Sequence, residues 1–247
     1  MLAETAAGAA AVLWVAPLWG AVKRGFFILT GTVAFGCAAL AALSLSAAAE
    51  SDPATLAWRA TATTAGALGL SLVALLFRLN AAGRFLGFLS VASAVAMLAA
   101  LASFGGSSYA LALFMLLAGA AFMGSVTDGL LLGHWYLTDR RLSREHIQRL
   151  SLLLIAAVVL EAVAIVSGGF SGTPAAAAGF SAILSVAGIT SWLALGMAAA
   201  TALIAVLIRA SLRGSRARAV QAATGFFYLA VITAFTAEMA AKIGFLG

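Results

Sequence analysis

The sequence predicts an all-α integral membrane protein that crosses the bilayer about eight times, and three observations support this fold class. Of the 247 residues, 64% are hydrophobic and only 9% are charged, whereas soluble domains keep roughly 25% charged residues. The apolar stretches are about 20 residues long, which is the length that crosses a hydrocarbon core of about 30 Å. Every Lys and Arg except Arg59 and Lys242 lies in alternate gaps between these stretches.

The apolar stretches form one polytopic domain over residues 1–247. We place its spans at residues 5–22, 26–47, 58–78, 84–104, 109–137, 148–168, 182–209 and 218–240. Each should be a helix, because lipid cannot satisfy unpaired backbone groups and the runs are too long for barrel strands. Pro17 should kink the first helix. Gly87–Phe88 and Gly225–Phe226 each follow a basic turn, and this echo suggests two four-helix halves.

The charged gaps predict which side of the membrane each connection occupies. The basic gaps are the first, third, fifth and seventh, with Lys23, Arg24, Arg78, Arg84, Arg140, Arg141, Arg144, Arg149, Arg209, Arg213, Arg216 and Arg218. Lys and Arg mark cytoplasmic loops, so these four gaps should be cytoplasmic and both termini should lie outside. We expect the protein in a bacterial cytoplasmic membrane.

Composition also excludes several classes of function. The formal charge of +6 does not predict nucleic-acid binding, because the cations lie beside apolar spans, as topology requires. The single cysteine, Cys37, excludes disulfides within the chain and Cys-rich metal centres, and we expect no metal site and no catalytic residues. Glu4 and the lack of a basic N-terminal region argue against a cleaved signal peptide.

Ionisable side chains inside the spans are candidates for function, because burying charge in a membrane is costly. Asp128 and Glu161 lie within the fifth and sixth spans, which form a hairpin, so their depths should be similar. They are candidates for a proton or cation relay. Alternatively, each is a protonated acid that hydrogen-bonds a neighbouring helix. We interpret Glu238, with Lys242 four residues later, as an ordinary interfacial ion pair.

A second candidate site lies at the predicted cytoplasmic end of the fifth span, where His134, Trp135 and Tyr136 are consecutive. With Asp128, these side chains have the chemistry to bind a quinone, either menaquinone or ubiquinone. Asp128 and Trp135 share a helix face, whereas His134 points about 120° away from Asp128, so one helix cannot supply the whole pocket. The alternative is an aromatic belt at the interface.

Haem binding is not expected. The chain has only two histidines, His134 and His146, on consecutive helices near one interface. Packed helices lie about 8–10 Å apart, which leaves little room for a haem between these two side chains.

Small residues and surface cations complete the pattern. Ser125, Gly129 and Gly133 recur every four residues and predict a close-packing helix face.

The cations of the fifth and seventh gaps form a basic rim. This rim either docks an acidic partner, or it only sets the membrane topology and attracts anionic lipid. The docking candidates are Arg140, Arg141, Arg144, Arg213, Arg216 and Arg218.

Three functional hypotheses follow. The first is a membrane subunit of a respiratory-type redox complex that anchors a cytoplasmic catalytic partner, lines a quinone site and serves electron transport. The second is a small secondary transporter or proton-coupled carrier that uses Asp128 and Glu161. The third is a scaffold or assembly protein. The first implies other subunits as partners, and all three imply the lipid bilayer.

Overall fold

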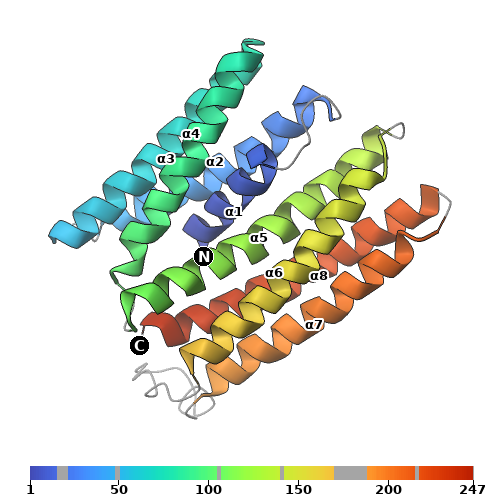
Figure 1. Cartoon of the computed structure of the whole chain (residues 1–247). Helices are drawn as coiled ribbons and strands as arrows, with labels where there is room; N and C mark the ends of the chain where they lie inside the picture. The colour runs from blue at the N-terminus through green and yellow to red at the C-terminus, as the bar shows by residue number, and fades with distance from the viewer. Residues whose placement is uncertain are drawn as a thin grey trace.

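The computed structural model describes residues 1–15, 22–47, 51–104, 107–139, 142–169, 188–214 and 217–246. Within these ranges the chain forms eight helices and no strand, which confirms the predicted all-α class (Figure 1). The helices are α1 (Leu2–Val15), α2 (Arg24–Ser46), α3 (Asp52–Leu76), α4 (Asn80–Ala102), α5 (Tyr109–Thr138), α6 (Glu145–Gly168), α7 (Ile189–Ser211) and α8 (Ala217–Leu246).

Seven of these helices, α2 to α8, are long and apolar enough to cross a membrane. The first helix differs from the prediction. It begins at Leu2 rather than near residue 5, and its 14 described residues span only about 21 Å. The predicted kink at Pro17 and the start of the predicted span 182–209 lie outside the described residues.

The helices pack as two groups of four, in agreement with the two predicted halves. In the first group α1 contacts α2, α2 contacts α3, α3 contacts α4, and α4 returns to α1. In the second group α5, α6, α7 and α8 close in the same order, with α8 returning to α5. The α1–α5 contact is the principal junction between the two groups, so the short helix α1 is central (Figure 1).

Connections from the predicted cytoplasmic gaps lie at one end of the bundle. Figure 1 places the turns after α3, α5 and α7 at one end and the C-terminus at the other. Lys23 pairs with Asp139 across 2.8 Å, joining the first gap to the fifth. Arg144 donates to the carbonyl of Gly214 at 2.6 Å, joining the fifth to the seventh. Which end faces the cytoplasm stays a prediction from charge.

Glycines set the spacing at the junctions of α5. A Cβ on Gly8 of α1 would overlap the backbone carbonyl of Ala120, and Gly8 also lies against the backbone of Gly124. On another side of α5, Gly129 lies against the ring of Phe227, and Gly133 against Thr224 of α8. The predicted close-packing role of Gly129 and Gly133 is therefore confirmed at the contact with α8, whereas Gly8 and Gly124 bring α5 close to α1 of the other half.

Candidate functional site

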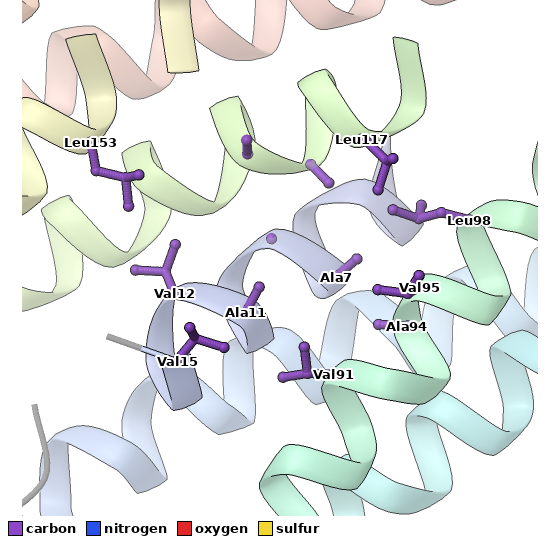
Figure 2. A pocket seen from close by; sticks show the side chains of 13 residues that line it. Ala7, Ala11, Val12, Val15, Val91, Ala94, Val95, Leu98, Leu117 and Leu153 are labelled. Carbon is purple, nitrogen blue, oxygen red and sulfur yellow. The ribbon is translucent and has the colours of Figure 1, made fainter. Parts of the chain in front are cut away.

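An apolar groove of about 430 Å³ runs between α1, α4 and α5 (Figure 2). All residues that line it are Gly, Ala, Val or Leu. The α1 wall consists of Ala7, Gly8, Ala11, Val12 and Val15. Val15 of α1 and Val95 of α4 are 65% and 51% exposed, so the groove opens onto the surface that would face lipid.

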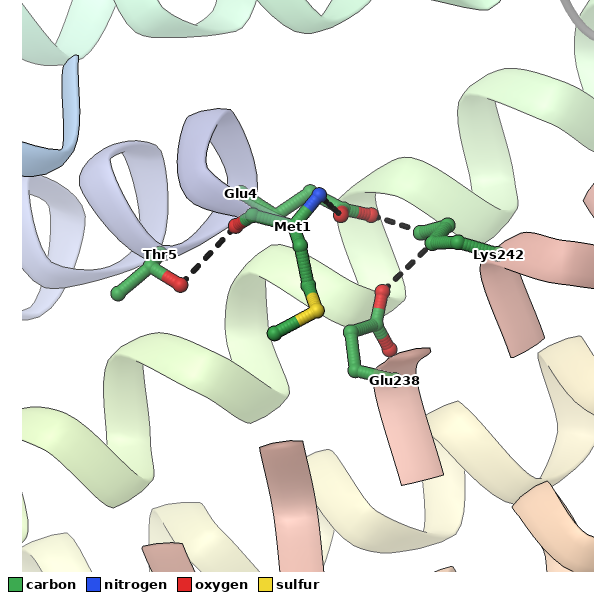
Figure 3. Close-up of polar contacts among 5 residues, drawn as sticks. All are labelled: Met1, Glu4, Thr5, Glu238 and Lys242. Atoms are coloured by element: carbon green, nitrogen blue, oxygen red, sulfur yellow. Dashed lines mark hydrogen bonds and ion pairs between the residues drawn. The ribbon is translucent and has the colours of Figure 1, made fainter. Parts of the chain in front are cut away.

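Beyond one end of this groove lies a buried group of charged side chains that we call the acid cluster: Glu4, Glu161, Glu238 and Lys242. The Lys242 ammonium lies 2.7 Å from Glu4 Oε1 and 2.9 Å from Glu238 Oε1, so α8 is tied to α1 (Figure 3). Both carboxyls are fully buried. Such a pair persists in a low-dielectric interior because each charge compensates the other.

The backbone around the acid cluster leaves space for its side chains. A Cβ on Gly119 of α5 would lie 2.7 Å from Glu4 Oε1 and would overlap the carboxyl of Glu238. Any other residue at this position would push the two carboxyls away from each other. Thr5 donates to the carbonyl of Met1 at 3.0 Å, which anchors the first turn of α1 beside Glu4 (Figure 3).

Glu161 of α6 is the third carboxyl of the acid cluster. Its side chain is 2% exposed, and it lies close enough to Glu238 and Lys242 to interact with both electrostatically. The three carboxyls outnumber the two cationic groups near them, which are Lys242 and the Met1 amino group, 2.6 Å from Glu4 Oε2. Full ionisation would therefore leave an uncompensated buried negative charge, which is costly.

Asp128 lies apart from the acid cluster. It is fully buried on α5, and neither carboxyl oxygen has a hydrogen-bond partner in the described part of the chain. Nine residues separate it from Gly119, a distance of about 14 Å along the helix. The structure therefore does not place Asp128 beside Glu161, although we expected similar depths for the two. It leaves Asp128 as an isolated buried acid.

The predicted quinone site comprised Asp128 and three consecutive residues, and those three point to different surroundings. His134 is exposed. Trp135 packs edge-on against Phe26 of α2, with ring centroids 6.3 Å apart. The Tyr136 hydroxyl donates to the carbonyl of Ser143, across the α5–α6 turn. Trp135 and Tyr136 thus have packing roles, and His134 is not gathered with them around one cavity.

The predicted docking residues are described only in part. Arg213 and Arg218 are exposed, and Arg144 is partly buried and bonds to Gly214. Arg140, Arg141 and Arg216 lie outside the described residues. The cations that are described therefore lie together at one end of the second half.

Sequence reasoning missed Glu4 but singled out the other three residues of the acid cluster. The Glu238–Lys242 pair is confirmed, and Glu238 is fully buried beside Glu4. Glu4 was interpreted only as evidence against a signal peptide. The available signal was a carboxyl in the first turn of a largely apolar, alanine-rich helix, where an unpaired charge would be costly.

Neither a metal-binding arrangement nor a similarity to known proteins identifies the function of this site. Among the described residues no group of three or more His, Cys, Asp or Glu side chains is arranged to hold a metal ion. No protein-family model, curated protein or solved structure matches the chain.

Proposed function

We propose that this protein is a small proton-coupled secondary transporter, and that the acid cluster is its proton-binding site. One observation carries the proposal: three buried carboxyls gather near two cationic groups, Lys242 and the Met1 amino group, inside a bundle whose helices are long enough to span a membrane. Ionisable groups buried within such bundles are rare and commonly mark proton or ion pathways. The excess of carboxyl groups provides a place for a proton that can be exchanged.

Each residue of the acid cluster has a distinct role in this proposal. Lys242 holds Glu4 and Glu238 in place through two ion pairs. Glu161 and Glu238 bind the exchangeable proton, because they are neighbouring buried acids on different helices and one negative charge near them is uncompensated. Movement of α6 relative to α8 would change the charges around this proton and release it. The proton is thereby linked to helix rearrangement.

The division of the bundle into two groups of four helices also supports a transport function. Many transporters are built from two similar halves that rock against one another around a site between them. Here the two groups of four helices meet chiefly at α1 and α5, and the acid cluster includes residues of α1 and of α6 and α8. A motion between the halves would therefore change the surroundings of Glu4.

Infrared difference spectroscopy across a pH step tests the proton-binding role directly. In lipid nanodiscs the wild type should show a change in the carboxylic acid C=O signal that Glu161→Gln and Glu238→Gln reduce. Glu145→Gln is the matched control, because Glu145 is exposed and pairs with Arg149 at the helix surface. Spectra of Glu161→Gln and Glu238→Gln that match the wild type would reject the acid cluster as the proton site.

A membrane subunit of a redox complex is a second candidate. Its specific support is the basic end of the second half, where Arg213, Arg218 and His134 are exposed. Acidic soluble subunits bind such surfaces through charge complementarity. Gentle purification with mass spectrometry tests this candidate: a co-purifying redox enzyme with a quinone would favour it. His134→Ala should then abolish quinone-linked turnover without loss of assembly.

A further inference from the structure

The α4 wall of the apolar groove leads to a basic turn. On α4 the groove is lined by Val91, Ala94, Val95 and Leu98 (Figure 2). Arg84 precedes three of these residues by 7, 11 and 14 positions, which is the spacing of one helix face. Arg84 is exposed. The face of α4 that lines the groove therefore continues to an exposed cation near the start of the helix.

The α3–α4 turn beside Arg84 carries only positive charge. Arg78 lies in this turn and is also exposed, and the sequence has no Asp or Glu from residue 53 to residue 127. Large apolar side chains adjoin both arginines, because Phe77 and Phe85 are 75% and 70% exposed. Long basic side chains near the end of a membrane helix extend toward the lipid headgroups. This turn therefore has the chemistry of the boundary between hydrocarbon and headgroups.

The distance along α4 matches the thickness of one leaflet of a bilayer. Fourteen residues separate Leu98 from Arg84, which is about 21 Å at 1.5 Å per residue. One leaflet with its headgroup layer is half of a bilayer of about 40–45 Å, or about 20–22 Å. An acyl chain that lies along the groove would therefore have its headgroup beside Arg84.

From this arrangement we propose that the groove binds an acyl chain of an anionic phospholipid, whose headgroup phosphate contacts Arg84. The Gly, Ala, Val and Leu lining matches a hydrocarbon chain and offers no partner to a polar group. Selectivity comes instead from the basic turn, because arginine binds phosphate oxygens through paired, charge-assisted hydrogen bonds. Anionic lipids are abundant in the cytoplasmic leaflet, the side to which the positive-inside pattern assigns this turn.

The bound chain would contact both halves of the bundle. The groove is lined by α1 and α4 of the first group of helices, and by Leu117, Ala120 and Ala121 of α5 and Leu153 of α6 in the second. A ligand that binds the folded arrangement stabilises it by mass action. The inference goes beyond the proposed transport function and does not depend on it.

Photolabelling of the full chain in nanodiscs tests the proposal. The probe is phosphatidylglycerol with a diazirine in one acyl chain, in a phosphatidylcholine bilayer, and labelled residues are located by mass spectrometry. Labelling of the α4 wall should be saturable, and unlabelled phosphatidylglycerol should compete about fivefold better than phosphatidylcholine with the same acyl chains. Arg84→Gln should abolish most of this preference, because one cation beside the membrane contributes about fivefold. Arg59→Gln is the matched control, since Arg59 is also exposed but lies near the start of α3, at the other end of the bundle.

A bulky substitution tests the groove itself. Val95→Trp should obstruct the groove and reduce the saturable labelling, whereas Val73→Trp on α3 is its control, with similar exposures of 51% and 49%. Equal competition by the two lipids, or an unchanged preference in Arg84→Gln, would overturn the anionic site and indicate that ordinary bilayer lipid fills the groove. Absence of labelling on the α4 wall would overturn acyl-chain binding and favour cover by a helix of another protein.

Discussion

The acid cluster and Asp128 are two buried acidic regions of one bundle, and they are built in opposite ways. In the acid cluster, the Glu4 and Glu238 carboxyls pair with one lysine, with Gly119 providing the space. Asp128 is alone and has no hydrogen-bond partner among described residues. The difference indicates that the acid cluster is stabilised by interactions inside the protein, whereas Asp128 gains no such stabilisation.

The largest predicted effect comes from breaking the acid cluster. Lys242→Met removes the cation from two buried carboxyls and should lower the free energy of unfolding by about 3–5 kcal/mol. Adding Glu4→Gln and Glu238→Gln should recover much of this loss. Denaturation in mixed detergent micelles measures both variants.

An exposed ion pair gives the control for that prediction. Lys23 is 74% exposed and pairs with Asp139, so Lys23→Met should cost no more than about 1 kcal/mol. If Lys242→Met and Lys23→Met cost the same, the acid cluster is not a tightly held ion-paired site.

A smaller loss is expected at the glycine contact between the two acidic regions. Gly8→Val should destabilise the protein by about 1–3 kcal/mol, because overpacking forces backbone shifts where α1 lies against Ala120 and Gly124. Gly36→Val is the control, since a Cβ on Gly36 meets nothing within 4 Å. Thermal unfolding of the two variants side by side measures the difference, and equal midpoints would mean that α1 and α5 do not pack this closely.

Substitution of Asp128 should change the free energy of unfolding in the opposite direction. Asp128→Val removes a buried acid without a hydrogen-bond partner among the described residues and should raise the free energy of unfolding by about 1–3 kcal/mol. Chemical denaturation checks this effect. A loss of stability instead would indicate that Asp128 already has a partner within the folded protein.

The smallest effects belong to the aromatic segment at the other end of α5. Tyr136→Phe removes the hydrogen bond to Ser143 and should cost about 1 kcal/mol. His134→Ala at an exposed position should stay within about 0.5 kcal/mol. Chemical denaturation measures the change in the free energy of unfolding for both variants. A much larger loss in His134→Ala would reveal a packing role that its exposure does not suggest.

Much of the fold was accessible from the sequence, because each strong signal there has a local cause. Long apolar runs predicted α2 to α8, and small residues at four-residue spacing predicted a close-packing face of α5, although not that α8 packs against it at Gly129 and Gly133. The start of α1 at Leu2 was not predicted, since its short apolar run continues into residues that were read as one longer span.

The candidate site was less accessible, because it is assembled from residues far apart in the chain. Glu4 and Lys242 are at opposite ends of the sequence, and only packing of α1 and α8 around Gly119 brings them together. Spacing within one helix identified the Glu238–Lys242 pair but not its burial. His134, Trp135 and Tyr136 are adjacent in sequence, yet helix geometry directs them to different surroundings.

The most direct test of proton-coupled transport is a flux measurement in proteoliposomes. Proton movement is followed with a pH-sensitive dye inside the liposomes under an imposed pH gradient, for wild type, Glu161→Gln and the exposed control Glu145→Gln. We predict proton movement above that of empty liposomes for the wild type and for Glu145→Gln, and none above it for Glu161→Gln. Equal movement by wild type and Glu161→Gln, or no movement by the wild type above empty liposomes, would contradict the account.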